Sequence, residues 1–152
     1  MAGTSGVFAR EFDEIGRTVQ VGFAGGRVIS VSFPAEPPGD ADGDHDLLDR
    51  IDAYLDGERD EFAEVALGLT VPTDQRAVLE ALRSVPYGEE VSVSRLARLA
   101  GFDSDDAADL ETVTGALADN PVPVLLPDHR VRGGPYATPG GVRSELRRVE
   151  GL

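Results

Sequence analysis

A run of apolar residues broken by three prolines, Pro121-Val-Pro-Val-Leu-Leu-Pro127, restricts the folds open to this chain more than any other segment. Proline lacks the backbone N–H that helix interiors and central strands need, so the run fits neither element. Its valines and leucines are nevertheless residues that fold to the inside. We therefore expect residues 121–127 to be extended and largely buried.

The first third of the chain predicts β-strands. Residues 19–23 and 27–33 are rich in β-branched and aromatic side chains, and the glycines between them are typical of a hairpin turn. Residues 8–12 supply a third strand. A stretch dense in proline, glycine and aspartate follows, and apolar residues at helical spacing then predict a helix from residue 47 to about Gly57.

The second half of the chain predicts helices. One helix starts at Thr73, which we expect to cap it, and a short helix capped by Ser92 or Ser94 ends at Gly101. A third helix covers about 105–118. Two short helices joined by a turn that contains glycine are typical of a helix-turn-helix.

Charge and composition exclude several classes of function. The chain has 152 residues and a formal net charge of −14, and all 14 of its basic residues are arginines. An acidic protein without lysine is typical of a salt-rich cytoplasm, so we expect a halophilic source. With neither a signal peptide nor an apolar run of about 20 residues, we expect a cytoplasmic protein without membrane contact. With no cysteine, disulfides, thiolate metal sites and thiol nucleophiles are all excluded.

The segment from Asn120 to Val131, Asn-Pro-Val-Pro-Val-Leu-Leu-Pro-Asp-His-Arg-Val, resembles the active-site stretch of the O6-alkylguanine-DNA alkyltransferases, the methylated-DNA–protein-cysteine methyltransferases. In that family Pro-Cys-His-Arg-Val follows Asn-Pro and an apolar run. The likeness extends over nearly the whole chain. Further matching segments are Thr73 with 75–78, 85–88 with Ser92 and 96–97, and 140–141 through 150–151.

This resemblance implies an α/β fold of two lobes. Residues 1–70 would form a small strand-rich, RNase H-like N-terminal lobe, and residues 71–152 a helical lobe with a winged-helix-like helix-turn-helix and the active site. The family moves an alkyl group from guanine O6 irreversibly onto its cysteine, after rotating the nucleotide out of the duplex. The implied partner is double-stranded DNA with an alkylated guanine, bound by a monomer without cofactor or metal.

The resemblance also assigns roles to single residues. The family's cysteine is activated through a water by the next histidine, here His129, which is oriented by a glutamate, here Glu150. The hinge asparagine is Asn120. The nucleophile's own position holds Asp128. Arg130 is an expected pocket or DNA-binding residue.

Two family residues that handle DNA are replaced. The arginine finger, nine residues before the hinge asparagine, is Glu111, and the tyrosine that helps to rotate the phosphate is Val93. Tyr136, in the loop after the active-site stretch, remains a predicted pocket residue. Residues 103–119 hold six acidic side chains and no basic one, which opposes contact with DNA phosphates.

Three hypotheses compete for Asp128. A carboxylate is a weak nucleophile toward saturated carbon, so the site is dead and Asp128 pairs with His129 or Arg130. Alternatively, a desolvated Asp128 attacks the alkyl carbon, as in haloalkane dehalogenases, and His129 with Glu150 activates water to hydrolyse the ester. The third hypothesis is a metal site formed by Asp128, His129 and Glu150.

The resemblance and the missing cysteine together predict the function. We favour a protein that does not transfer alkyl groups, either a damaged-DNA binder or a module that contacts another repair protein; an Asp128-based dealkylating enzyme is the alternative. Cysteine-less alkyltransferase-like proteins bind damaged DNA, but they carry tryptophan at the position of Asp128 and keep the arginine finger.

Two other polar groups have simple structural explanations. Five arginines between residues 130 and 148 are interpreted as a solvated helix face, with phosphate contact as the alternative. His45 lies in an acidic segment, 40–46, that fails the calcium-loop pattern, so we expect a solvated loop.

Overall fold

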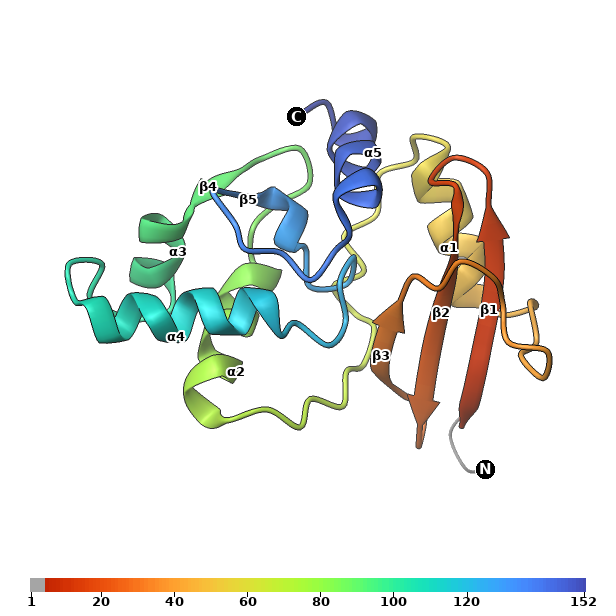
Figure 1. The fold of residues 1–152 in the computed structure, drawn as a ribbon, viewed down its shortest axis with the longest axis horizontal. Coiled ribbons are helices and arrows are strands. Elements are labelled where there is room, and N and C mark those ends of the chain that lie inside the picture. The colour runs from red at the N-terminus through yellow and green to blue at the C-terminus, as the bar shows by residue number, and fades with distance from the viewer. Residues whose placement is uncertain (1–4) are drawn as a thin grey trace.

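The computed structural model describes residues 5–152 and has two lobes side by side, with the β1–β3 sheet at one end and α2–α4 at the other (Figure 1). The elements are β1 (Gly6–Phe12), β2 (Arg17–Ala24), β3 (Arg27–Ser32), α1 (Asp46–Leu55), α2 (Thr73–Arg83), β4 (Val91–Ser92), α3 (Val93–Leu99), α4 (Ala107–Ala118), the 3₁₀ turn η1 (Asp128–Arg130), β5 (Val131–Arg132) and α5 (Gly140–Glu150).

The N-terminal lobe is a three-stranded antiparallel sheet in the order β1-β2-β3, packed against α1. The central strand β2 is buried over most of its length, because Val19, Val21 and Phe23 all pack into the core. The buried residues of α1 recur at helical spacing, as expected for a helix that covers a sheet. The predicted hairpin, third strand and helix are confirmed.

The second lobe contains the predicted helix-turn-helix, formed by α3 and α4 packed on α2. The Ser92 Oγ accepts a hydrogen bond from the Arg95 N–H at 3.1 Å, so Ser92 caps α3. Asp106 caps α4 in the same way. The expectation that Thr73 caps α2 is wrong: Pro72 occupies the cap position, and Thr73 is the first helical residue.

The proline-broken run is buried, as expected, but it is not extended. Val124 has a left-handed backbone with φ of 77°, and the Leu126 N–H donates to the Val122 carbonyl at 2.9 Å. Asn120 closes this turn, since its Oδ1 accepts from the Val122 N–H at 3.1 Å and its Nδ2 donates to the Leu126 carbonyl at 2.8 Å. A compact turn pairs backbone groups that an extended, buried run would leave without partners.

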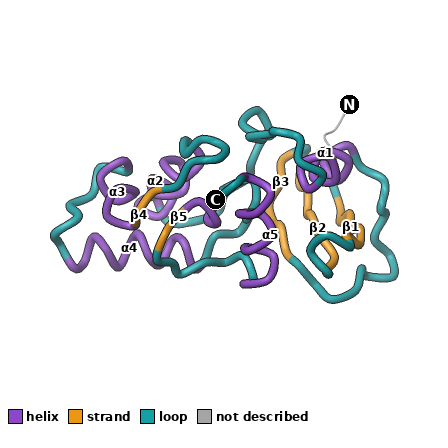
Figure 2. Tube along the Cα trace, turned by 90° about the horizontal axis from the view of Figure 1, so that it is seen from above, coloured by secondary structure: helices purple, strands orange, loops and turns teal. Residues whose placement is uncertain are grey.

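The two lobes share one continuous hydrophobic core. The Val31 N–H of β3 donates to the Pro121 carbonyl at 2.9 Å, so the sheet is tied directly to the proline-broken run. Figure 2 shows α5 between the sheet and the α2–α4 helices. The parallel pair β4–β5 likewise joins the start of α3 to the end of η1. Among residues 5–152, no helix combines the length and apolar character needed to cross a membrane.

Candidate functional site

Asp128, at the nucleophile position, is completely buried at the start of η1. Its carboxylate accepts hydrogen bonds from the Thr138 hydroxyl at 2.6 Å, the Ala137 N–H at 2.9 Å and the Thr138 N–H at 3.2 Å. The Asn120 amide approaches it at 3.4 Å. The expected pairing of Asp128 with His129 or Arg130 is therefore wrong, because the loop before α5 supplies its partners instead.

His129 and Arg130 both turn to Glu150, the buried last residue of α5. The distance between His129 Nε2 and Glu150 Oε2 is 2.7 Å, and Arg130 donates from Nε at 2.8 Å and from Nη2 at 3.0 Å. The Gly88 N–H donates to the same carboxylate at 2.9 Å. The Tyr54 hydroxyl also donates to this carboxylate. Glu150 is thus the centre of a buried ionic network, and the predicted His129–Glu150 pair exists.

Tyr54 is a side chain of this network that the sequence did not identify as a site residue. It comes from α1 in the N-terminal lobe, and its hydroxyl lies 3.3 Å from His129 Nε2. In the sequence it was one apolar position of an amphipathic helix. No local signal separates it from its neighbours, because its role depends on the approach of α1 to α5, 96 residues away in sequence.

Burial and hydrogen bonding act differently on the two carboxyl groups. Burial raises the pKa of Asp128 above its usual range, although the Thr138 and Ala137 donors oppose the shift. Burial also acts to raise the pKa of Glu150, but hydrogen bonds from His129 and Arg130 outweigh it, so that pKa lies well below its usual range. The hydrogen bonds thus favour the ionised form of Glu150, whereas burial disfavours the ionised form of Asp128.

One polar atom of the site has no partner. His129 Nδ1 is buried and makes no hydrogen bond to any described residue, while the other ring nitrogen faces Glu150. With Nε2 directed at the Glu150 carboxylate, Nδ1 is the ring nitrogen that is left without a hydrogen-bond partner among the described residues. Asp128 is shielded from solvent and held by several donors, which weakens it as a nucleophile.

The third hypothesis for Asp128 finds no support in this geometry. The ligand atoms of Asp128, His129 and Glu150 are not grouped within 4.8 Å of one another; within residues 5–152 such a grouping occurs only among exposed acidic side chains of the N-terminal lobe. Asp128 and Glu150 instead face separate sets of hydrogen-bond donors.

The two residues that replace the family's arginine finger and tyrosine, Glu111 and Val93, are not part of this network. Glu111 is exposed on α4, and Val93 is half-buried at the start of α3. The Tyr136 hydroxyl donates to the Val131 carbonyl at 2.7 Å and accepts from Arg143 at 2.9 Å, so Tyr136 braces the loop that supplies the donors to Asp128. Their predicted roles toward DNA stay predictions.

The predicted solvated stripe of arginines is mostly turned inward. Arg130 is buried against Glu150, and Arg147 donates to the His129 carbonyl at 2.9 Å and to Glu90 at 2.7 Å. The Arg143 guanidinium lies over the Tyr136 ring, 4.0 Å from its centroid. The exposed members are Arg132 and Arg148. These side chains therefore brace the site more than they cover the surface.

His45 also differs from its prediction. Its ring is half-buried and stacks on Phe23 with centroids 4.5 Å apart, and its Nδ1 accepts from the Leu47 N–H at 3.0 Å. The acidic residues beside it, Asp42 and Asp44, are exposed, as expected for a solvated loop. His45 is therefore the cap of α1, because the chain needs an acceptor there.

Replacing Asp128 by asparagine is expected to stabilise the protein at neutral pH by about 0.5–2 kcal/mol. The amide oxygen can accept from the loop N–H groups, and the Thr138 hydroxyl can rotate to accept from the amide NH₂, so no charge is buried.

Because the pKa of Asp128 is raised on folding, wild-type stability falls as pH rises from the unfolded value of 3.8 through the folded one. Denaturant unfolding should show a gain that grows over this interval; a loss at neutral pH would contradict the cost assigned to the buried charge.

A family model described as the DNA-binding domain of 6-O-methylguanine DNA methyltransferase matches residues 73–148. The chain is 36% identical over 108 residues to the methylated-DNA–protein-cysteine methyltransferase of Methanothermobacter thermautotrophicus, covering 68% of this chain and 58% of that protein. It is 35% identical over 108 residues to the enzyme of the same name from Mycobacterium leprae, covering 69% and 62%. The match thus spans less than two thirds of either relative.

The similarity in structure extends further along the chain. The Mycobacterium tuberculosis protein OGT, solved in complex with DNA, superposes with a TM-score of 0.72 at 25% identity, over 96% of this chain and 91% of that one. This superposition includes the sheet as well as the helix-turn-helix. The predicted fold class, an α/β protein with a helix-turn-helix of this type, is confirmed.

Proposed function

Because the chain belongs to the 6-O-methylguanine DNA methyltransferase family, we propose that it is a member that binds DNA and does not transfer alkyl groups. The observation that carries this proposal is the state of Asp128. Its carboxylate is completely buried and held by the Thr138 and Ala137 donors, so it serves to hold the loop before α5 in place.

The lack of transfer follows from the chemistry of oxygen and sulfur. A thiolate is a soft, strong nucleophile toward saturated carbon, whereas a carboxylate is a weak one, and the oxygens of Asp128 are already occupied by hydrogen-bond donors. The chain contains no cysteine at any position that could take over. His129 and Glu150 then keep the arrangement of a base and its orienting acid as part of the folded core.

DNA binding is supported by the helix-turn-helix and by the family model that covers it. The exposed acidic residues of the α4 region, Asp105, Asp106 and Glu111, repel phosphates, so affinity depends on salt that screens them. Recognition of an alkylated guanine, rather than of any duplex, belongs to the same proposal, as do a cytoplasmic location and a monomeric state.

The proposal is tested by duplex binding in about 2–3 M KCl, where the Debye length is near 3 Å or less. Fluorescence anisotropy with a duplex that contains one O6-methylguanine, and with the matched undamaged duplex, should show tighter binding of the first. Equal affinity for both duplexes would remove lesion recognition, and no binding would favour a module that contacts another protein. Intact-mass measurement after incubation should show no added methyl group; an adduct on the wild-type chain would overturn the proposal.

The Asp128→Cys variant separates two causes of inactivity. Methyl transfer by this variant would show that the missing thiol alone explains the lack of alkyl transfer. Failure of a folded variant to react would show that the replacements at Glu111 and Val93 also contribute to it.

The raised pKa of Asp128 and the free Nδ1 of His129 favour a second candidate, turnover through an Asp128 ester. In this scheme a carboxylate oxygen bonds to the alkyl carbon as the bond to guanine O6 breaks, and the released guanine takes up a proton at N1. Water activated by His129 then hydrolyses the ester to an alcohol, which restores the Asp128 carboxylate and releases one proton. Unchanged O6-methylguanine, together with unmodified protein, would exclude it.

A further inference from the structure

The hydrogen-bond donors around Asp128 converge on both of its carboxylate oxygens. Oδ2 accepts from the Ala137 N–H at 2.9 Å and the Thr138 N–H at 3.2 Å, and the Asn120 amide lies 3.4 Å from it. Oδ1 accepts from the Thr138 hydroxyl at 2.6 Å. We call these four uncharged donors the carboxylate cradle. Because they engage two oxygens on one carbon, the cradle fits a carboxylate, and Asp128 is the carboxylate that fills it.

The cradle fastens the loop of residues 133–139, which connects β5 to α5, over the turn η1. Ala137 and Thr138 belong to this loop, so three of the four donors move with it. With the loop in this position, Asp128 and His129 have no solvent-exposed surface, and Thr138 is 3% exposed. A molecule from solvent therefore reaches these side chains only after the loop has moved.

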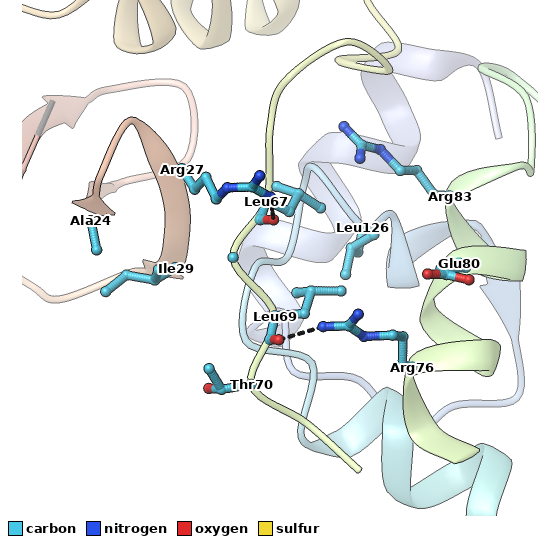
Figure 3. Close-up of a pocket in the computed structure, with 11 residues that line it drawn as sticks. Ala24, Arg27, Ile29, Leu67, Leu69, Thr70, Arg76, Glu80, Arg83 and Leu126 are labelled. Atoms are coloured by element: carbon cyan, nitrogen blue, oxygen red, sulfur yellow. Dashed lines mark hydrogen bonds between the residues drawn. The ribbon is translucent and has the colours of Figure 1, made fainter. Parts of the chain in front are cut away.

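Two cavities lie near the site without reaching these side chains. Figure 3 shows the pocket of about 600 Å³ between the sheet and α2; Leu126 is part of its lining, whereas Asp128 and His129 are not. A second cavity, of about 360 Å³, is lined by Tyr54 of α1 but not by His129. Neither opening leads to the cradle.

We propose that Asp128 is an internal ligand that keeps the site shut, so that this protein binds a duplex without taking a nucleotide out of the base stack. Taking a nucleotide out costs unstacking and unpairing energy, which contacts in the receiving pocket must offset. Here the donors of Ala137 and Thr138 are already bound to Asp128, so an entering base would have to displace that side chain first. The statement about the duplex rests on the proposed DNA binding, whereas the shut site does not.

The shut site is tested by the rate at which diethyl pyrocarbonate modifies His129, followed by peptide mass spectrometry. The chain has two histidines, so the half-buried His45 is an internal reference, and the free Nδ1 of His129 is an atom at which the reagent can act once the site opens. In the wild type His129 should react far more slowly than His45. Asp128→Ala empties the cradle and should speed the reaction of His129, relative to His45, about tenfold or more, the effect of losing hydrogen bonds to a carboxyl group.

Small anions show whether the cradle selects a carboxylate. Formate has the two oxygens of the missing group, so potassium formate should return His129 in Asp128→Ala toward its wild-type rate. An equal concentration of KCl should not. Formate should leave the wild type unchanged, because Asp128 already occupies the cradle.

Three further variants separate the contacts of Asp128 from general destabilisation. Asp128→Asn keeps an oxygen for the loop N–H groups and should leave His129 protected. Thr138→Val keeps Asp128, removes the 2.6 Å contact and should speed His129 severalfold, which also serves if Asp128→Ala does not fold. Asp105→Ala makes the same change as Asp128→Ala at an exposed position and should have no effect.

Three outcomes of the modification experiment would overturn the shut site. The first is wild-type His129 that reacts as fast as His45. The second is His129 that stays protected in folded Asp128→Ala and in Thr138→Val. The third is folded Asp128→Ala that responds equally to formate and to chloride.

The statement about the duplex is tested with 2-aminopurine placed beside O6-methylguanine, because the fluorescence of this base rises when it loses a stacking neighbour. A duplex with an abasic site in place of the lesion gives the signal of a missing neighbour. Saturating wild-type protein, with binding followed by anisotropy, should leave the fluorescence nearly unchanged. A rise toward the abasic signal would overturn this half of the inference and leave DNA binding intact. No change in anisotropy would overturn the proposed DNA binding and this half together, while histidine modification decides the shut site by itself.

Discussion

Replacing Glu150 by glutamine is expected to lower the free energy of unfolding by about 3–5 kcal/mol at neutral pH, the cost of breaking a buried ion pair from one side. Glutamine would leave the buried Arg130 without a counter-charge. It would also place an NH₂ group where Oε2 accepts from His129, Arg130 and Tyr54. Guanidinium chloride unfolding, followed by circular dichroism, measures the loss.

The pH dependence gives this prediction a second readout. The pKa of Glu150 is lowered on folding, so its stabilising contribution is complete above the unfolded value of 4.5 and is lost as pH falls toward the folded value. The difference between wild type and Glu150→Gln should therefore be largest at neutral pH and shrink below about pH 4.5.

A matched control lies on the same helix. Glu145 pairs with Arg148 at the surface, and Glu145→Gln makes the same chemical change there, so it should leave the free energy of unfolding almost unchanged. Adding Arg130→Met to Glu150→Gln should recover part of the loss, because no charge is then left unpaired. A loss below about 1 kcal/mol for Glu150→Gln alone would contradict the central role given to this carboxylate.

The second large effect is expected on α4, the second helix of the helix-turn-helix. Glu111→Arg changes the local charge by two units at the position where the family carries its finger, and we expect duplex affinity to rise about tenfold at roughly 0.2 M KCl. A new phosphate contact should also steepen the plot of log affinity against log salt by about 0.9. This prediction rests on the proposed DNA binding.

The measurement is fluorescence anisotropy over a KCl series, limited to concentrations at which circular dichroism shows the protein folded. Glu36→Arg is the matched control, because Glu36 is exposed in the loop between β3 and α1, outside the helix-turn-helix. An equal gain in both variants would mean that only net charge matters. No gain in Glu111→Arg would mean that α4 does not face the duplex.

Local patterns predicted most elements of this fold. The hairpin and α1 follow from alternation and helical spacing, and Ser92 caps α3 as its position suggested. The chain path through 121–127 was not predictable in this way. Proline content excluded regular structure there, but Asn120 decides the turn through its contacts with Val122 and Leu126.

The site shows the same division. The motif placed His129 and Glu150 together, and the structure confirms their contact. It did not reveal that Thr138 and Ala137 bind Asp128 or that Tyr54 reaches Glu150 from the other lobe. Hydrogen-bond partners of buried groups come from whichever segments the core brings within about 3 Å, which local sequence does not encode.

The sequence by itself therefore determined that no cysteine thiol is available to accept an alkyl group, because this holds whatever the fold. It also determined where most of the helices and the strands of the β1–β3 sheet form, since those preferences act over a few residues. Only the tertiary structure decided the state of Asp128 and the inward direction of Arg130 and Arg147. Burial and pairing are properties of the packed core, where removal from water makes every charge depend on its neighbours.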